Sequence, residues 1–143
     1  MASRLITDLH PDLQTLCQQF LNLCTTQGLD ILVICTYRSS AEQDALFAIG
    51  RTVNPDAQIV TRAQGGFSPH NATNSDGSPC AKAFDAVPIS NGKIDWSGTS
   101  PAWKTMFALG SQLGLDLGAN FPAGLKDSDH FQLSNWKDIP CQS

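Results

Sequence analysis

Basic residues are scarce in this 143-residue chain, and its nine lysines and arginines are scattered singly. The formal net charge is -4. Because phosphate backbones are bound by clustered lysine and arginine, this charge excludes nucleic acid as the main partner. No apolar run approaches the ~18 residues that span a bilayer, and the opening stretch "MASRLITDLHPDLQ" lacks an apolar signal core. We therefore expect no membrane insertion and no classical secretion signal.

The five cysteines are odd in number and contain no C-x-x-C pair. Cys17, Cys24 and Cys35 lie among apolar residues, where a free thiol behaves as a small hydrophobic group. Cys80 and Cys141 are the only pair that we consider for a bridge. The pattern favours a fold without disulfides.

The first half of the chain alternates helical and strand patterns. Apolar residues at helical spacing predict a helix over 11–27, which ends at Gly28. The β-branched run 29–36 predicts a buried strand. A second helix is predicted over 40–50, with Ser40 and Gln43 forming a capping box.

The second half begins with a long loop and continues with strands around one helix. The loop over 51–80 is rich in Gly, Asn, Ser, Pro and Thr, and loops of this length in a small domain are usually functional or mobile. A strand is predicted over 81–89 and a hairpin or edge strand over 90–96. A helix follows, with Ser100 as its N-cap and Pro101 as its first residue. Two closing strands are predicted at 113–118 and 129–133. Helices set apart from a small, mostly antiparallel sheet define an α+β fold. Without repeats or linkers, residues 1–143 form a single domain.

Only three histidines are present, and two of them have acidic residues nearby. We expect His10 to be exposed or to cap the first helix. Two imidazoles and one carboxylate suffice for a catalytic zinc ion, because three protein ligands leave a fourth position for water. Zinc lowers the pKa of such a water to about 7. His70, Asp85 and His130 can supply these ligands, and Asp127 can supply the base.

Each of these residues also has an ordinary structural interpretation. An isolated histidine in a polar loop, such as His70, is usually a surface residue, and Asp127 and Asp129 fit a turn. Asp85 is harder to explain this way, because a carboxylate in an apolar strand is costly unless it is paired or metal-bound. Strand alternation could still turn Asp85 toward solvent.

The order of four motifs carries a family resemblance. "TYRSSAEQDALFAIGRT", "VTRAQGGFSPH", "AFDAVPI" and "DSDHFQL" follow one another in the chain. This order resembles the peptidoglycan peptidases of the D-Ala-D-Ala carboxypeptidase and L-Ala-D-Glu endopeptidase superfamily (M15-type). It is most similar to the L-alanyl-D-glutamate endopeptidase branch, which includes many bacteriophage endolysins. The resemblance covers residues 8–133 and implies one Zn2+ ion, held in a cleft at the sheet edge by His70, Asp85 and His130.

The resemblance also implies the catalytic groups. Asp127, three positions before His130, matches the family's catalytic acid, with Asp129 as the rival if the loop shifts register. Arg38 matches an arginine that lies by the substrate, where its guanidinium suits a developing oxyanion or a carboxylate.

Two further residues are implied near the substrate. Gln43 would help to hold the arginine region, in addition to its place in the capping box. Ser68 would hydrogen-bond near the substrate or orient the histidine, and a plain turn residue is the alternative.

The chain departs from the family pattern between His70 and Asp85, where fourteen residues intervene and the family usually has fewer. Asp76 lies closer to the usual spacing and competes for the ligand role. We prefer Asp85 because it has the family's strand context. The oxygen-bearing side chains of the extra loop 71–79 could hold Ca2+, but a solvated loop that shapes substrate access is the favoured interpretation.

The predicted function is zinc-dependent hydrolysis of the L-Ala-D-Glu bond of peptidoglycan stem peptides by a phage lysis enzyme. The alternatives are a D,D-carboxypeptidase acting on D-Ala-D-Ala and a non-catalytic, zinc-stabilised wall-binding module. We expect a monomer whose partner is bacterial peptidoglycan, with no separate wall-binding domain. The protein would wait in the host cytoplasm and reach the wall at lysis.

Overall fold

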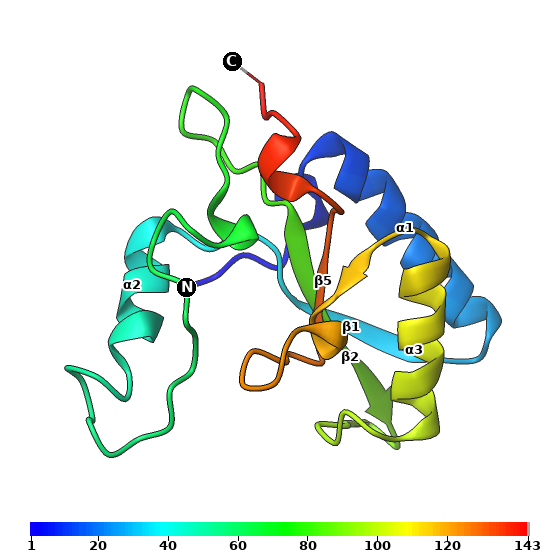
Figure 1. The fold of residues 1–143 in the computed structure, drawn as a ribbon. Coiled ribbons are helices and arrows are strands. Elements are labelled where there is room, and N and C mark those ends of the chain that lie inside the picture. The colour runs from blue at the N-terminus through cyan, green and yellow to red at the C-terminus, as the bar shows by residue number, and fades with distance from the viewer. Residues whose placement is uncertain (143) are drawn as a thin grey trace.

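The computed structural model describes residues 1–142 and has three α-helices around one sheet. Helices α1 (Pro11–Thr26) and α3 (Pro101–Gln112) pack together beside the sheet, whereas α2 (Ser40–Ala48) lies apart from them (Figure 1). Four 3-10 turns complete the helical elements: Ile6–Asp8, Pro69–Asn71, Gly118–Asn120 and Trp136–Asp138.

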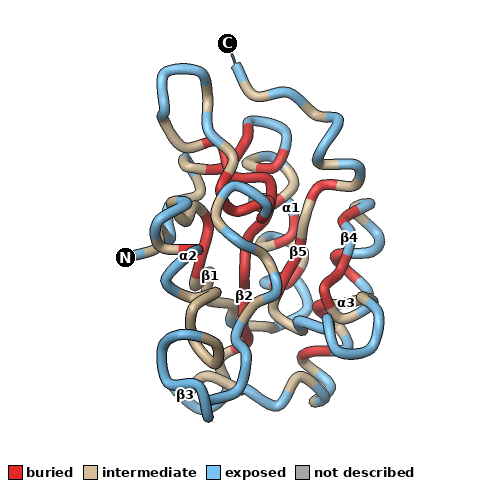
Figure 2. Tube along the Cα trace, turned by 60° about the vertical axis from the view of Figure 1, so that its left-hand side comes forward, coloured by how far each residue is buried: buried red, intermediate tan, exposed pale blue. Residues whose placement is uncertain are grey.

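The sheet is antiparallel at every pairing and has the order β1-β2-β5-β4, with β3 paired to β2. Strand β2 is the most buried strand and runs through the middle of the molecule (Figure 2). The strands are β1 (Asp30–Cys35), β2 (Ala83–Ser90), β3 (Lys93–Ile94), β4 (Asp116–Leu117) and β5 (His130–Gln132). Helices packed on a mostly antiparallel sheet confirm the predicted α+β class.

Strand alternation separates the core from the candidate site. Phe84 of β2 and Phe131 of β5 are paired in register and stack with ring centroids 5.4 Å apart, and Phe20 of α1 packs on both rings. Successive strand residues point to opposite faces. The next register pair, Asp85 and His130, therefore points away from α1 and α3.

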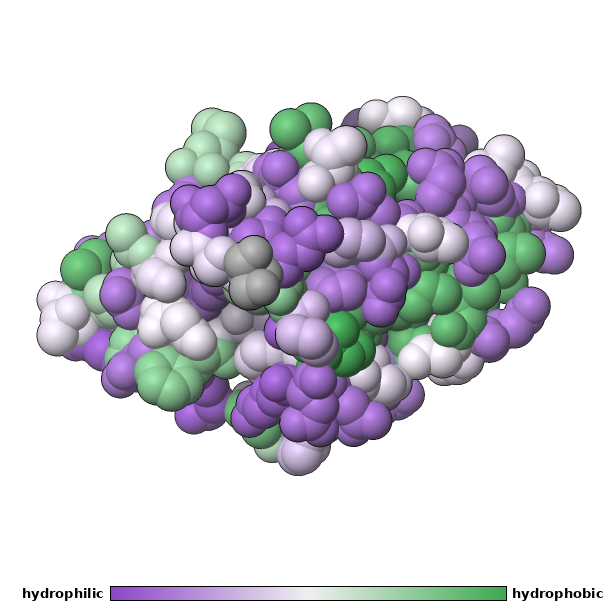
Figure 3. Space-filling view, turned by 90° about the horizontal axis from the view of Figure 1, so that it is seen from above, coloured by the Kyte–Doolittle hydropathy of each residue, from purple (hydrophilic) through white to green (hydrophobic). Residues whose placement is uncertain are grey.

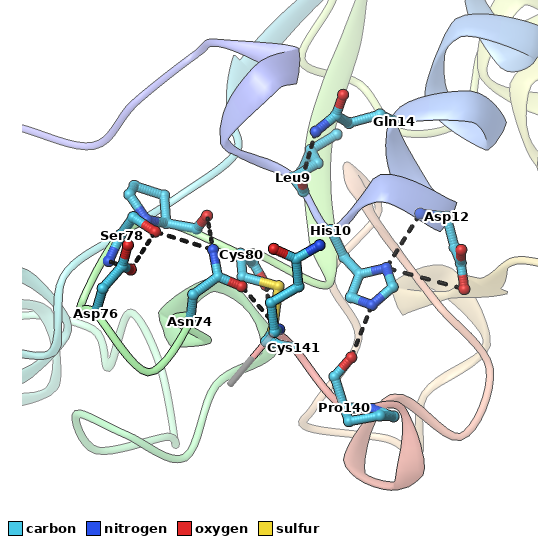
Figure 4. The surroundings of a disulfide bond; sticks show 12 residues. Leu9, His10, Asp12, Gln14, Asn74, Asp76, Ser78, Cys80, Pro140 and Cys141 are labelled. Carbon is cyan, nitrogen blue, oxygen red and sulfur yellow. Dashed lines mark hydrogen bonds and ion pairs between the residues drawn. A yellow bond between two sulfur atoms is a disulfide. The ribbon is translucent and has the colours of Figure 1, made fainter.

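The start of α1 confirms one half of the expectation for His10. Its Nδ1 accepts a hydrogen bond from the Asp12 backbone N–H at 3.1 Å, so the residue is the N-cap. The expected exposure is wrong, because only 8% of His10 is accessible. The C-terminal segment covers the ring, whose Nε2 donates to the Pro140 carbonyl at 2.9 Å (Figure 4).

The capping box of α2 lies one residue earlier than predicted. Ser39 Oγ accepts from the Glu42 backbone N–H at 3.1 Å, and Glu42 Oε1 accepts from the Ser39 N–H at 2.9 Å. Ser40 and Gln43 are not the capping pair. Gln43 is instead fully buried, with 1% of its surface exposed.

A disulfide joins Cys80 to Cys141, contrary to the expectation of a fold without disulfides (Figure 4). The C-terminal segment folds back along the loop before β2, which brings the two Cα atoms to 6.3 Å, within the range that a disulfide spans. The Gln142 backbone N–H also donates to Asn74 Oδ1 in that loop at 3.0 Å. The other three cysteines are free and buried, as predicted.

The long segment between α2 and β2 contains local structure. Its second part forms a small hairpin in which Thr73 pairs with Pro79, and the hairpin tip is exposed. Within residues 1–142, no helix is both long enough and apolar enough to cross a membrane. The face seen from above carries mostly hydrophilic side chains with smaller apolar areas between them (Figure 3).

Candidate metal centre and cleft

Three buried donor atoms form a nearly equilateral triangle. His70 Nε2 lies 3.2 Å from Asp85 Oδ1, His130 Nδ1 lies 3.3 Å from the same oxygen, and the two ring nitrogens are 3.3 Å apart. Bond lengths of 2.0–2.2 Å to a tetrahedral Zn2+ ion separate its ligands by about 3.3–3.6 Å. The spacing of these donors therefore fits one small tetrahedral ion.

The outer ring nitrogens fix which nitrogens carry lone pairs. His70 Nδ1 lies 2.8 Å from the Thr36 carbonyl oxygen, and His130 Nε2 lies 2.8 Å from Gln132 Oε1. Both oxygens are acceptors, so each of these nitrogens must carry a hydrogen. In neutral imidazoles the lone pairs of Nε2 of His70 and Nδ1 of His130 then face the centre, as metal ligation requires.

Backbone contacts hold His70 in place within its 3-10 turn. Ser68 Oγ accepts from the His70 backbone N–H at 3.2 Å, and the His70 carbonyl accepts from the Arg38 backbone N–H at 3.0 Å. Ser68 also lines the cleft in front of the centre. Ser68 therefore caps the turn that carries His70 and borders the space available to a ligand.

Without an ion, the centre is a buried charge pair. Burial favours neutral forms, but the Asp85 carboxylate outweighs it and raises the pKa of His70 to about 10. Burial likewise opposes ionisation of Asp85, but His70 and His130 outweigh it and lower the pKa of that carboxyl. A negative carboxylate between two imidazoles is an arrangement that a cation stabilises.

Arg38 links the centre to helix α2. Its guanidinium NH2 lies 3.9 Å from Asp85 Oδ2, and its NH1 donates to Gln43 Oε1 at 2.9 Å. Arg38 lines the cleft. Gln43 does not, so its side chain supports Arg38 and does not reach the space where a substrate would lie.

The cleft has a volume of about 620 Å3, and both candidate acids line it. Asp127 is exposed, and a carboxylate oxygen of it lies within 4.8 Å of donor atoms of Asp85 and His130. Asp129 is partly buried, and burial, the Asp85 charge and Asp127 together raise its pKa to about 9. Because a protonated carboxyl cannot accept a proton, Asp127 is the better candidate for a base near neutral pH.

Asp76 does not belong to this centre. It is exposed at the hairpin tip, does not line the cleft, and accepts a hydrogen bond at 2.9 Å from the Ser78 backbone N–H in its own turn. Groups of acidic, histidine and cysteine residues that could hold a metal occur, within residues 1–142, only around Asp85. The loop 71–79 therefore gains no support as a Ca2+ site.

Sequence reasoning missed the side chains that support the centre. Cys35 Sγ accepts from Arg38 NH2 at 3.4 Å and lies 3.7 Å from His70 Nδ1. Gln132 had a usable signal, because residues two apart on a strand share a face and it follows His130 by two positions. The centre lines a cleft, as predicted, and its two strand residues come from the interior strands β2 and β5.

The fold and the centre define a small α+β domain with a buried cluster of potential metal ligands beside a cleft. The family described as VanY, D-alanyl-D-alanine carboxypeptidase, matches residues 6–136. The peptidoglycan L-alanyl-D-glutamate endopeptidase CwlK of Bacillus subtilis is 30% identical over 136 residues, which cover 89% of this chain and 74% of CwlK. The chain belongs to the VanY family.

Two solved structures share the fold. The L-Ala D-Glu endopeptidase ChiX of Serratia marcescens has a TM-score of 0.58 at 21% identity, with 90% of this chain and 83% of ChiX covered. The LD-carboxypeptidase LdcB has a TM-score of 0.63 at 14% identity, with 87% of this chain and 58% of LdcB covered. At these identities the likeness concerns the fold alone.

Proposed function

We propose that the protein is a zinc-dependent endopeptidase that hydrolyses the L-Ala-D-Glu bond of peptidoglycan stem peptides. The donor triangle of His70, Asp85 and His130, with sides of 3.2–3.3 Å, carries this proposal. The names of the relatives CwlK and ChiX support the choice of bond. An exposed acid beside the triangle supports catalysis over mere wall binding.

The residues that line the cleft have different roles in the proposed reaction. When bound, Zn2+ would act as a Lewis acid and lower the pKa of a coordinated water molecule. Asp127 takes the proton of the attacking water and returns it to the departing amine. Arg38 offers its guanidinium to the negative charge that develops on the carbonyl oxygen. An ion pair with Asp85 and a hydrogen bond to Gln43 hold this guanidinium in place.

Fragment analysis of digested peptidoglycan tests the proposal. The zinc-supplemented protein should release peptides with a new N-terminal D-Glu, and a chelator should abolish their release. Asp127→Asn is the matched control, because it removes the base but leaves the three ligands, and we expect at least a hundredfold loss of kcat. Unchanged release in the presence of a chelator would contradict the role of the metal.

A D,D-carboxypeptidase is the second candidate, because the family is described by that activity. It would use the same groups, but its product would be free D-Ala. Mass spectrometry of the same digests separates the two activities. A zinc-loaded protein that turns over no wall preparation would instead support the wall-binding alternative.

We further propose that the enzyme acts as a monomer on the wall of a bacterial host during phage lysis. The Cys80–Cys141 disulfide is consistent with action outside the cytoplasm, since disulfides persist mainly in oxidising compartments.

A further inference from the structure

The cleft is lined by three basic side chains and by three carboxylates, and two of the basic side chains have no acidic partner in the described part of the chain. Arg38, Arg62 and Lys126 line the cleft and make up three of the nine basic residues of a protein whose net charge is -4. Arg38 is already engaged with Asp85 and Gln43. Arg62 and Lys126 are exposed, and no carboxylate among residues 1–142 lies within 4 Å of either cation.

The backbone on both sides of Arg62 is held by a residue of helix α2 and by one that follows this helix. Gln43 Nε2 donates to Thr61 Oγ1 at 3.2 Å and to the Ala63 carbonyl at 2.9 Å. Arg51 NH1 donates to the Thr61 carbonyl at 3.1 Å. The buried glutamine that holds Arg38 therefore also fixes the segment that carries Arg62, so the two arginines have a defined relative position.

The Arg62 side chain reaches the loop on the other side of the cleft. Its Nε donates to the Gly124 carbonyl at 3.2 Å, which uses one of the five N–H donors of the guanidinium. Ile59, Val60 and Leu125 also line the cleft, with exposed apolar surface. Apolar surroundings strengthen charge-assisted hydrogen bonds, so the free donors form a favourable place for an anion.

We infer that Arg62, which shares the cleft lining with Lys126, binds a free carboxylate of the peptide substrate. The inference rests on the proposed function. Glutamate has two carboxyl groups, and only one of them forms the next amide bond of a stem peptide, so the other stays ionised near the scissile bond. A guanidinium binds such a carboxylate through two parallel hydrogen bonds. Arg62 thus selects peptides whose glutamate carboxyl is free over those in which it is amidated.

Two synthetic stem peptides test the inference. They differ only in having the free glutamate carboxyl as an acid or as an amide. The wild-type protein should cleave the acid with the higher kcat/KM, and Arg62→Gln should lower kcat/KM for the acid about tenfold, mainly through KM, while changing the amide less than twofold. Arg62→Lys keeps the positive charge but cannot form two parallel hydrogen bonds. Its kcat/KM for the acid peptide should lie between those of the wild-type and Arg62→Gln proteins. Lys104→Gln removes an exposed charge outside the cleft and should change neither peptide.

The outcomes distinguish the inference from the proposed function. Equal losses for both peptides in Arg62→Gln would mean that Arg62 only holds the loop, and unchanged kinetics would mean that it binds nothing; either result overturns the inference. If the wild-type protein cleaves neither peptide, the proposed function fails. Calorimetric titration of the wild-type and Arg62→Gln proteins with the two peptides then still tests carboxylate binding, and equal affinities in all four titrations would overturn it.

Discussion

Asp85 holds the most connected position of any residue in the centre. Its Oδ1 faces both ring nitrogens, and its Oδ2 lies opposite the Arg38 guanidinium. The carboxylate therefore serves the ion-binding side and the arginine side of the site at once. Its charge is also the main reason why the pKa of His70 is raised against the effect of burial.

Replacement of Asp85 should remove the metal. In Asp85→Ala, one of the three donors is lost, and we expect at least a hundredfold weaker Zn2+ binding. Asp76→Ala is the matched control, because that carboxylate lies in an exposed turn outside the cleft. Measuring zinc by elemental analysis after dialysis should find about one ion per chain in the control and almost none in Asp85→Ala. Retention of zinc by Asp85→Ala would disprove the ligand assignment.

Among the structural elements, β2 and β5 position the centre. Asp85 and His130 are 45 positions apart in the chain, yet they are direct neighbours in the strand register. The third residue of the donor triangle, His70, comes from a 3-10 turn whose backbone is hydrogen-bonded to the segment after β1. Pairing of three distant segments therefore builds the site.

The disulfide holds the C-terminal segment on the loop before β2, and its loss should lower stability. A cross-link that spans 61 positions lowers the entropy of the unfolded chain, which stabilises the folded state by about 4 kcal/mol. Measured stabilisation by disulfides is commonly about 2–4 kcal/mol. Urea unfolding of Cys141→Ser should show a loss of about that size. Reductant should lower the free energy of unfolding of the wild-type protein to that of the variant, and it should leave the variant's own value unchanged. If reductant does not change the stability of the wild-type protein, the Cys80–Cys141 disulfide is not formed.

Local patterns predicted the elements well, and their failures have physical causes. Both Ser39 with Glu42 and Ser40 with Gln43 match a capping box, so the pattern alone does not choose between adjacent frames. The buried position of Gln43 depends on contacts with Thr61 and Ala63, which come from a distant loop.

The motif order pointed to the three residues that form the donor triangle, but the distances between their donor atoms could not be predicted from the sequence. These distances depend on strand register and on the placement of a loop, which are non-local properties. The disulfide was missed for the same reason, because 61 positions separate its cysteines. The raised pKa of Asp129 likewise results from burial and from the nearby carboxyl groups of Asp85 and Asp127.

For the molecule as a whole, the centre links protonation to stability. Folding raises the pKa of His70 from 6.5 to about 10 and that of Asp129 from 3.8 to about 9, so the folded state binds both protons more tightly. Each group contributes its full stabilisation at a pH below its pKa in the unfolded chain. This stabilisation is lost as the pH rises through its pKa in the folded protein. Asp85, with its lowered pKa, contributes above pH 3.8 and loses its effect only in acid.

The metal-free protein should therefore become less stable between pH 6 and pH 10. Urea unfolding of chelator-treated protein at several pH values measures this, and Asp129→Asn should make the decline shallower. Added Zn2+ should oppose the decline, because ligation requires His70 without its proton and so strengthens as the pH rises. A metal-free protein whose stability is constant or increases over this range would show that the charge pair is not formed.

The hairpin over 73–79 lies outside the cleft, and its tip is open. Gly77 has a φ of +86°, and a side chain placed on it would meet nothing within 4 Å. Strand pairing sets the register of Asp85 and His130, and no residue of the hairpin lines the cleft, so a change at the hairpin tip should leave both intact. It is accordingly a natural place to graft a fluorophore or a targeting peptide without disturbing the chemistry behind it.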